Sequence, residues 1–271
     1  MVGYYANQQR GTSLIHHMSM NKWRILPLTI ADQQQHLDCS EMLLRTIEPW
    51  HPATLYWSIA EPKGLVLGFS QKEDALNLEG VAQQQIPIYH RRAGGTAVLV
   101  GPHLLSLDVV LPAGHPLVLA DIVKSYEWFG EAWVEMLERL GIEARVVLPQ
   151  EAREQHVLLK QPETQVREEL LRRACFGSIS PYEVVVGQRK VVGLDMIRRK
   201  VGSVLQAGVL LQWETATLAK LLGRSLDEQA WLEEGLQERA IGLSRLVDHT
   251  LNVTEVIAAF EQVVLSMDKV G

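Results

Sequence analysis

The order of helix-like and strand-like segments constrains the fold of this chain more than any other feature of its sequence. One amphipathic helix is predicted over residues 121–140, where apolar side chains recur at three- and four-residue spacing and Gly141 follows as a cap. Strand-like runs lie on both sides of it, and helical patterns resume from Thr215 onward. This order is not a regular βαβ series, so it predicts an α+β (mixed α/β) fold, a mixed β-sheet flanked by helices.

The remaining elements follow from local periodicity and from proline and glycine positions. Helices are predicted over 32–47 and 76–85, and a surface loop or helix over 150–173. The predicted strands are 54–59, 65–68, 87–92, 97–100, 104–111, 144–148, 182–186, 190–193 and 204–211, with 97–100 and 104–111 forming a hairpin. Because no linker rich in Pro, Gly and Ser interrupts this pattern, we predict one catalytic domain over 23–271, with a helical C-terminal part over about 214–271 and a flexible N-terminal extension over 1–22.

Composition excludes several classes of protein. Apolar residues make up 47% of the 271 residues and charged residues 21%, which is typical of a soluble globular protein. The net charge of −6 argues against nucleic acid as a partner, and no apolar run reaches the roughly 18 residues that span a bilayer. Cys39 and Cys175 are far apart and the histidines are scattered, so we expect no disulfide scaffold, no metal site and a cytoplasmic location.

The first candidate site is the segment from Arg91 and Arg92 to Gly94 and Gly95. Paired glycines let the backbone approach a ligand closely, and two arginines before them suit a phosphate, a carboxylate or an adenylate. A tight turn between two strands, with solvated arginines, explains the same residues about as well.

The second candidate site combines Cys175 with Lys190. A cysteine is an effective nucleophile when nearby cations favour its thiolate, and a lysine before a glycine turn can donate to a developing oxyanion. From the residues alone, a buried small apolar role for Cys175 and a solvated role for Lys190 are the more frequent outcomes.

The third candidate site is the run of three cations Arg198, Arg199 and Lys200, which we place in a turn. A solvated turn explains it, and the functional alternative is a docking site for an acidic carrier protein.

The order of these segments resembles the biotin/lipoate A/B protein ligase superfamily, and in particular its cysteine-type octanoyltransferases and lipoate–protein ligase A-like proteins. Four stretches carry the resemblance: Leu55–Gln71, which ends in a G-x-x-Q element, Arg91–Pro112 with the double glycine, Ala174–Gly193 with the cysteine and lysine, and Ser203–Leu211. The resemblance covers the chain from about Ile30 and implies a class II biotin/lipoate-ligase-like catalytic domain.

Within that superfamily the late signature favours the transferase over the ligase. Cysteine-type octanoyltransferases carry Cys-Phe and then Tyr-Glu seven residues after the cysteine, as do Cys175-Phe176 and Tyr182-Glu183 here. The ligases usually carry Asn-Asp before the lysine, and this chain has no such pair. The resemblance therefore implies a transferase that needs no cofactor, whereas a ligase would need ATP and Mg²⁺.

The resemblance also implies roles for residues and partners. Cys175 would form an octanoyl or lipoyl thioester, and Lys190 with backbone N–H groups near Gly94 and Gly95 would stabilise the oxyanion. The acyl- or substrate-binding residues would be Arg91, Arg92, Gly94, Gly95, Thr96, Ala97, Gly193, Gln206 and Gly208. The donor would be acyl carrier protein or another octanoylated carrier, and the acceptor a lysine of a lipoyl-domain protein such as the glycine cleavage H protein or a dehydrogenase E2.

Two alternatives stay open, and three departures from the family pattern motivate the second of them. Gly101-Pro102 replaces a His-Asp pair, Ala207 replaces the histidine of Leu-Gln-His-Gly, and Leu194-Asp195 replaces small polar residues. The alternatives are an ATP-dependent lipoate–protein ligase and a diverged, non-catalytic acyl- or carrier-binding protein.

Overall fold

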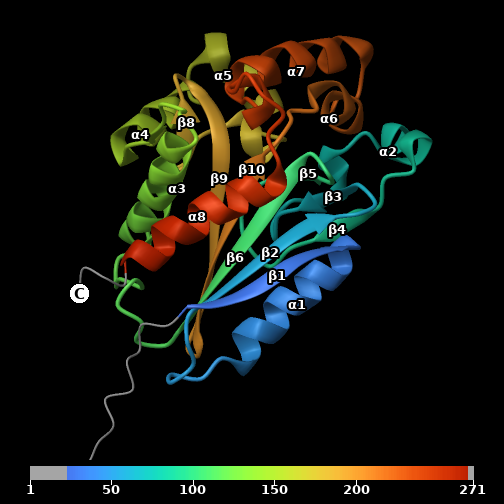
Figure 1. The fold of residues 1–271 in the computed structure, drawn as a ribbon. Coiled ribbons are helices and arrows are strands. Elements are labelled where there is room, and N and C mark those ends of the chain that lie inside the picture. The colour runs from blue at the N-terminus through green and yellow to red at the C-terminus, as the bar shows by residue number, and fades with distance from the viewer. Residues whose placement is uncertain (1–22, 268–271) are drawn as a thin grey trace, which may run out of the picture.

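The computed structural model describes residues 23–267, which form two β-sheets and the helices around them (Figure 1). The larger sheet has seven strands in the order β1-β2-β6-β10-β9-β8-β7, and its neighbours are antiparallel except for β1 and β2. In that order the strands are β1 (Arg24–Ala31), β2 (Thr54–Ala60), β6 (Leu104–Pro112), β10 (Gly202–Leu210), β9 (Arg189–Arg199), β8 (Val184–Val186) and β7 (Arg145–Val146). The smaller sheet has the order β4-β3-β5, formed by β4 (Ile88–His90), β3 (Gly64–Leu67) and β5 (Val98–Val100).

Helices surround both sheets. They are α1 (Gln33–Thr46), α2 (Leu78–Gln84), α3 (Glu127–Arg139), α4 (Pro149–Leu158), α5 (Pro162–Leu171), α6 (Thr215–Leu222), α7 (Leu226–Arg239) and α8 (Val253–Met267). Short 3-10 turns are η1 (Glu73–Ala75), η2 (Lys124–Tyr126), η3 (Cys175–Gly177) and η4 (Leu243–Arg245). None of the helices within residues 23–267 has the length and apolar character needed to cross a membrane.

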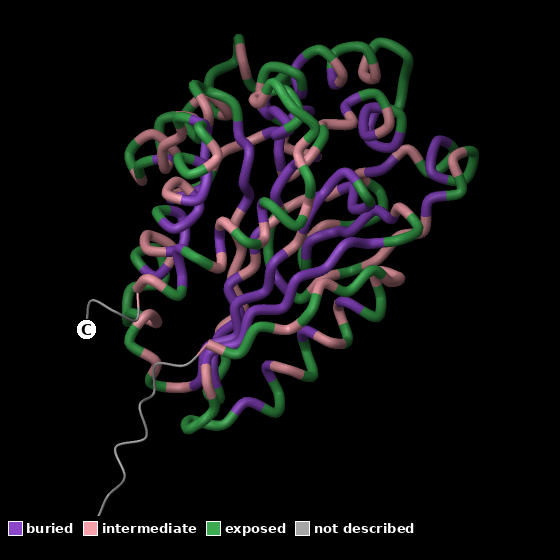
Figure 2. Tube along the Cα trace, in the orientation of Figure 1, coloured by how far each residue is buried: buried purple, intermediate pink, exposed green. Residues whose placement is uncertain are grey.

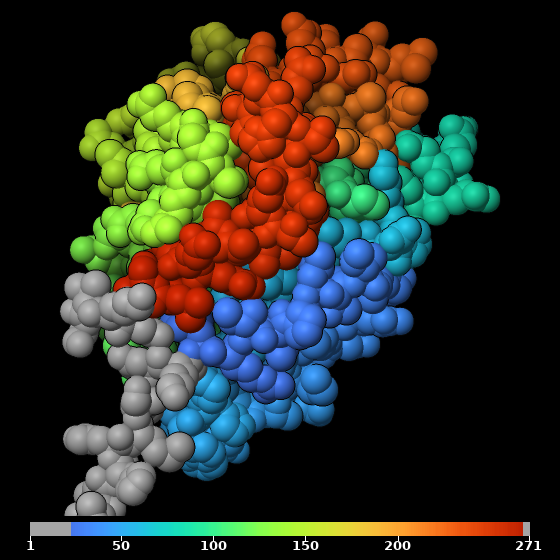
Figure 3. All heavy atoms as spheres, viewed as in Figure 1, coloured from blue at the N-terminus to red at the C-terminus, as the bar shows by residue number. Residues whose placement is uncertain are grey.

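One face of the large sheet forms the main hydrophobic core with α3 and α8. Strands alternate the direction of successive side chains, and the alternate residues Leu105, Leu107 and Val109 of β6 are fully buried in this core. Trp133 of α3 stacks on Phe260 of α8 with ring centroids 4.1 Å apart. The central strands are buried along most of their length (Figure 2), and α8 lies across the sheet in the space-filling view (Figure 3). This face is therefore closed.

The opposite face is covered in part by α1, which begins at a cap. The Asp32 carboxylate accepts a hydrogen bond of 2.8 Å from Gln34 N, as expected of a residue that satisfies a free N–H at a helix start. Near its end, α1 packs Leu44 and Ile47 on the sheet. Between these two points the helix stands over polar and small residues of the sheet, and this is where the site lies.

The structure confirms the predicted mixed sheet flanked by helices but corrects several elements. The predicted hairpin of 97–100 and 104–111 is wrong, because β5 pairs with β3 in the small sheet while β6 pairs with β2 and β10. The predicted long helix over 121–140 starts only at Glu127, after the 3-10 turn η2. The stretch 150–173 forms two helices, α4 and α5.

Two further differences concern strands. Strand β1 was not predicted, because Pro27 interrupts its pattern and its pairing with β2 shifts register between Leu26 and Thr29. Strand β9 extends to Arg199, so the predicted turn at Arg198–Lys200 is wrong for its first two residues. The predicted N-terminal extension over residues 1–22 lies outside the described part of the chain.

Candidate active site

A row of small residues forms the floor of a cavity on the face of the sheet opposite α3 and α8. Ser58 of β2 pairs with Ser106 of β6, and Ser106 pairs with Gly208 of β10. Gly208 pairs in turn with Gly193 of β9, so four neighbouring strands present small residues in register. Cross-strand partners share a face of the sheet, and side chains this small leave room above them for a ligand.

A second row, two residues along each strand, makes one wall of the cavity polar. It consists of Tyr56, Asp108, Gln206 and Asp195 in matching register. The buried Asp108 carboxylate accepts hydrogen bonds from Ser40 Oγ and, at 2.8 Å, from Gln206 Nε2. Burial raises the pKa of Asp108, and these two hydrogen bonds oppose the shift.

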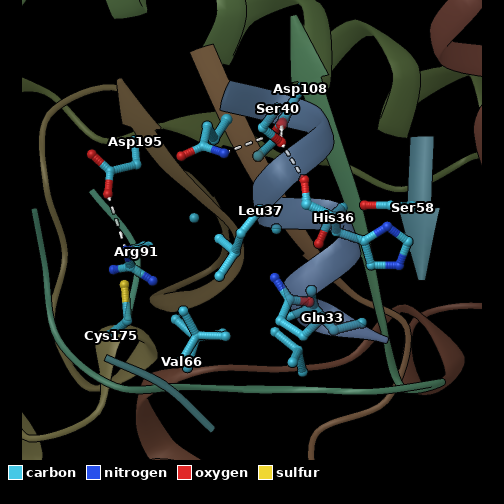
Figure 4. A pocket seen from close by; sticks show the side chains of 18 of the residues that line it. Gln33, His36, Leu37, Ser40, Ser58, Val66, Arg91, Asp108, Cys175 and Asp195 are labelled. Atoms are coloured by element: carbon cyan, nitrogen blue, oxygen red, sulfur yellow. Dashed lines mark hydrogen bonds and ion pairs between the residues drawn. The ribbon is translucent and has the colours of Figure 1, made fainter. Parts of the chain in front are cut away.

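Three separate parts of the chain cover this floor. Helix α1 supplies Gln33, His36, Leu37 and Ser40, the small sheet supplies Val66, Val98 and Val100, and η3 supplies Cys175 and Phe176. Figure 4 shows Cys175 at one side of the cavity, Leu37 and Val66 in the middle, and His36 and Ser58 at the other side. The cavity therefore runs from a thiol, past apolar side chains, to hydroxyl and imidazole groups.

The backbone on either side of Cys175 is fixed by neighbouring segments. Cys175 N donates to Ala97 O at 2.8 Å, and Ala97 N donates to Arg173 O at 3.1 Å. Gln71, the last residue of the G-x-x-Q element, donates from Nε2 to Arg173 O at 3.1 Å. These bonds hold the cysteine against the double-glycine loop, so the two predicted motifs meet in space.

The glycines are needed at this junction because the chains approach so closely. A Cβ on Gly68 would lie 2.0 Å from Gly95 O, and one on Gly95 would lie 2.6 Å from Arg91 Nη2. Gly95 also has a φ of +83°, in the left-handed region that glycine adopts without strain. The same hypothetical Gly95 Cβ would be 3.8 Å from Cys175 Sγ, which places the sulfur close to the Arg91 guanidinium, as Figure 4 shows.

Arg91 is held in place by several groups. It donates from Nε to Gly94 O at 2.9 Å and from Nη2 to Thr96 O at 3.2 Å, and it forms an ion pair of 3.5 Å with Asp195. Burial raises the pKa of Asp195, and the Arg91 charge opposes that shift. Arg91 therefore shapes the double-glycine loop and places its guanidinium on the same side of the cavity as the sulfur.

Lys190 is buried beneath Cys175 and paired with Glu183. Its Nζ lies 2.8 Å from Cys175 O, 2.9 Å from Glu183 Oε2 and 5.0 Å from the centre of the Phe176 ring. Both side chains are only 2% exposed. Burial raises the pKa of Glu183, and the charge and hydrogen bonds of Lys190 oppose that shift. A buried ion pair of this kind is a costly arrangement, which points to a function beyond stability.

Backbone N–H groups are available near the thiol. Within residues 23–267, those of Gly94, Gly95 and Thr96 donate no hydrogen bond, whereas the N–H of Cys175 is used by Ala97 O. Free N–H groups in a loop beside a nucleophile are the usual donors to an oxyanion. The geometry therefore leaves the predicted donors free.

A second hollow opens on the other side of Cys175. It is lined by Gly95, Thr96, Cys175, Glu183 and Lys190, together with Tyr126, Ser178 and Asp195. Cys175 thus lies between two spaces, which is the arrangement needed when two parts of a substrate, or two substrates, must reach one sulfur.

A groove with basic residues borders the cavity and shares Leu37, Ser40, Arg91 and Gln206 with it. Its cationic residues include Arg45, Arg92, Arg199 and Lys200. We call these four residues the basic rim. Arg92 is paired with Glu41 at 2.8 Å, whereas Arg199 and Lys200 are exposed and make no such contact within the described chain.

Arg198, predicted with its two neighbours as a docking residue, instead contacts the protein. Its Nη2 donates to Ser125 Oγ at 2.9 Å and its Nη1 to Ala120 O at 3.4 Å. Arg198 therefore joins β9 to η2 and to the loop before it, and it does not belong to the basic rim.

Most of the sequence-predicted residues line the cavity or the second hollow in the structure. Arg91, Cys175, Gly193, Gln206 and Gly208 line the cavity, and Gly95, Thr96 and Lys190 line the second hollow. Ala97 is buried and acts through its backbone, and Arg92 lies on the rim.

Several lining residues were not predicted from the sequence. They are Gln33, His36, Ser40, Ser58, Ser106 and Asp108, with Glu183 as the partner of Lys190. A sequence signal existed for three of them: polar residues at alternate positions of otherwise apolar strands, at Ser58, Ser106 and Asp108, mark a face that differs from the core. In residues 23–267, no group of three or more His, Cys, Asp or Glu side chains is placed to hold a metal ion.

The mixed sheet flanked by helices is a fold shared with lipoate-ligase structures. A putative lipoate protein ligase from T. acidophilum with bound lipoic acid superposes with a TM-score of 0.67 at 18% identity, over 92% of this chain and 86% of that one. A lipoate-protein ligase A bound with ATP gives 0.67 at 19% identity, over 92% and 85%.

The family described as the lipoyl protein ligase A/B catalytic domain matches residues 32–265, and this chain belongs to that family. Relatives include the octanoyltransferase LipM of Moorella thermoacetica, 30% identical over 237 residues, or 82% of this chain and 81% of the relative. The octanoyltransferase LipM of Lysinibacillus sphaericus is 29% identical over 219 residues, or 78% and 75%. The predicted superfamily is thus confirmed.

Proposed function

We propose that this protein is a cysteine acyltransferase that moves an octanoyl or lipoyl group from a carrier protein to a lysine of a lipoyl-domain protein. One observation carries the proposal: Cys175 lies between the cavity and the second hollow, with Lys190 buried 2.8 Å from its carbonyl oxygen. The names of the octanoyltransferase relatives support it. The free thiols of Cys39 and Cys175 agree with a cytoplasmic location.

In the first step, the Cys175 thiolate attacks the carbonyl carbon of the donor. With an acyl thioester as donor, a new C–S bond forms, the carbon–sulfur bond to the donor breaks, and the donor thiolate leaves and takes up a proton. The free N–H groups of Gly94 to Thr96 would stabilise the oxyanion, and the acyl chain would lie in the cavity. With an octanoyl amide as donor, the leaving lysine amine takes up a proton in the same position.

In the second step, the ε-amine of the acceptor lysine attacks the acyl-enzyme from the second hollow. A C–N bond forms, the C–S bond to Cys175 breaks, and the amine loses one proton as the thiolate is restored. Lys190 would hold the Cys175 backbone in place and add positive charge beneath the reacting carbonyl, with Glu183 fixing its Nζ. This scheme requires no cofactor.

The carriers would dock at the basic rim. The chain as a whole carries a charge of −6, so attraction to an acidic carrier must be local. Arg199 and Lys200 are exposed on the groove that borders the cavity, where a carrier could present its acyl group. The donor would be acyl carrier protein or an octanoylated carrier, and the acceptor the glycine cleavage H protein or a dehydrogenase E2 lipoyl domain.

Intact mass spectrometry tests the proposal. After incubation with octanoyl-acyl carrier protein, we expect a single octanoyl adduct on the protein, without ATP, that disappears when a lipoyl-domain acceptor is added. Product that forms only with ATP and Mg²⁺ would show the ligase reaction instead. Binding of the carrier with neither adduct nor product would show a non-catalytic binding protein.

A further inference from the structure

The end of the cavity away from Cys175 has hydrogen-bonding groups without partners. Ser58, Ser106 and Gln33 line the cavity, and their side chains make no hydrogen bond within residues 23–267. Ser58 and Ser106 are cross-strand partners, so their side chains are neighbours on one face of the sheet. Gln206 donates to Asp108 from its amide nitrogen, which leaves its carbonyl oxygen free to accept.

Gln206 belongs to a buried polar network that lies beside the two serines and Gln33. Asp108 accepts from Ser40 and Gln206, and His36 lies 2.8 Å from Tyr56 Oη and 2.9 Å from Ile59 O. Because a carbonyl only accepts, His36 Nε2 carries a proton and its Nδ1 accepts from the neutral Tyr56 hydroxyl. The polar end is therefore a rigid part of the fold.

The distance from Cys175 to the polar end of the cavity suits the far end of a medium-length acyl chain. The floor row starts at Gly193, whose hypothetical Cβ lies 3.4 Å from Phe176, next to Cys175, and passes Gly208 and Ser106 before it reaches Ser58. Neighbouring strands lie about 4.8 Å apart, so Ser106 and Ser58 are roughly 10 and 14 Å along the row. An extended acyl chain of about eight carbons would end near Ser106, so a hydroxyl on its last carbon would lie between Ser106 and Ser58.

A plain hydrocarbon end fits these groups poorly. It would exclude water from the two serine hydroxyls and the Gln206 carbonyl and would offer no hydrogen bond in return, which is unfavourable. A hydroxyl on the chain end both donates and accepts, so it could bond to a serine hydroxyl and to Gln206 Oε1 together. A site built to bind a hydroxyl discriminates against the analogue that lacks it.

We infer that the cavity selects medium-chain acyl groups with a hydroxyl at or near the far end of the chain over plain octanoyl. The inference rests on the proposed function only in that the chain enters from Cys175. It assigns to Ser58, Ser106 and Gln206 a part in specificity, and Cys175 performs the same acyl transfer whichever chain is bound.

Binding and acylation are measured separately to test this inference. Calorimetry on the Cys175→Ala protein compares octanoyl and 8-hydroxyoctanoyl N-acetylcysteamine thioesters, and intact mass on the unchanged protein compares their adducts. We expect the hydroxyacyl probe to bind about tenfold more tightly, the size expected of one or two buried hydrogen bonds. The double variant Ser58→Ala/Ser106→Ala should reduce that preference to about twofold or less, whereas the exposed Ser244→Ala should leave it unchanged.

The outcomes distinguish this inference from the proposed function. Equal binding of the two thioesters, or tighter binding of octanoyl, would overturn the inference even if both probes acylate Cys175. A tenfold preference in binding with no adduct from either probe would support the inference and overturn the acyl-enzyme. A preference that survives in the double serine variant would also overturn it, because the hydroxyls would then not be its source.

Discussion

The surroundings of Cys175 and Cys39 differ, although both cysteines are free, half-buried and close to the same cavity. Cys39 lies in α1 beside Tyr56 and Asp108. Burial raises the pKa of the Cys39 thiol, and the negative charge of Asp108 raises it further. Cys175 instead lies beside the Arg91 guanidinium and above Lys190. Exposure alone does not distinguish the two thiols, whereas the sign of the neighbouring charges does, and this difference supports the nucleophilic role that we propose for Cys175.

The same contrast divides the cavity into two functional ends. The Cys175 end offers cations and free N–H groups, which suit the reacting carbonyl, and the Asp108 end offers acceptors and hydroxyls, which suit the chain terminus. If this division is right, changes at the first end should alter the rate of acyl transfer, and changes at the second should alter stability or the choice of acyl chain.

The largest effect is expected from the cysteines themselves. Cys175→Ala should abolish the acyl-enzyme and reduce transfer by at least about 10³-fold, because Cys175 supplies the only thiol within residues 23–267 that lines both the cavity and the second hollow. The Cys39→Ala protein should still form the acyl-enzyme and should transfer the acyl group at the normal rate. Intact mass and single-turnover transfer measure the two properties. Full transfer by the Cys175→Ala protein would contradict the covalent mechanism and favour the ATP-dependent ligase.

Lys190→Arg should give the next largest loss, at least about 10²-fold in rate, the scale of removing an oxyanion donor. A guanidinium is bulkier and planar, so it cannot place one compact charge between Cys175 O and Glu183 in a site that is 2% exposed. The exposed Lys124→Arg is the matched control.

Thermal unfolding of both lysine variants separates a loss of chemistry from a loss of structure. A variant that melts normally but transfers slowly supports the role proposed for Lys190. Turnover close to normal would reduce Lys190 to a counter-ion for Glu183, and the Cys175 end would then depend on Arg91 alone for its positive charge.

Charge reversal on the basic rim should have a moderate effect. We expect Arg199→Glu/Lys200→Glu to raise the KM for acyl carrier protein about tenfold at low salt and to flatten its salt dependence, because exposed charges act over a Debye length of about 8 Å at physiological salt. The control Arg153→Glu/Lys160→Glu makes the same charge change at one exposed residue of α4 and one in the turn that follows it. Transfer from a small acyl thioester should be spared. An equal loss on both substrates would place the rim in the fold or the acyl site.

The sequence allowed the Cys175 end to be predicted better than the other end. Cys175, Lys190 and the double glycine occur in short motifs whose order in the chain is distinctive, and these motifs meet in the structure. Ser58, Ser106 and Asp108 have no motif, since each is one polar residue within an apolar strand. They form a site only because four strands align in register, and strand order cannot be read from local periodicity.

Arg198 and β5 also show that local sequence patterns do not reveal which residues or strands become partners. A run of three cations does not indicate which of them faces solvent, and Ser125, which binds Arg198, is far away in sequence. The short turn between β5 and β6 is typical of a hairpin, yet β5 pairs with β3. Local patterns predict elements, whereas partners depend on tertiary contacts.

The smallest effect is expected at the contact that holds α1 over the polar end. Tyr89 donates to the Asp32 carboxylate at 2.6 Å, which lowers the pKa of Asp32, while burial and that hydrogen bond raise the pKa of Tyr89 to about 12. This hydrogen bond therefore makes its full contribution to the free energy of unfolding at pH values between the ordinary pKa of an aspartate and that of a tyrosine. It is lost when acid protonates Asp32 below its lowered pKa, or when base ionises Tyr89 near pH 12.

Tyr89→Phe should consequently lower the free energy of unfolding by about 0.5–1.5 kcal/mol near neutral pH, the usual size of one hydrogen bond. The difference between the two proteins should shrink as the pH falls through the lowered pKa of Asp32, because a protonated carboxyl is a weaker acceptor. Urea unfolding at several pH values measures it, with acylation of Cys175 followed in parallel. A difference that does not change with pH would show that Tyr89 acts by packing. A loss of acylation as large as that of Lys190→Arg would show that the two ends of the cavity are not independent.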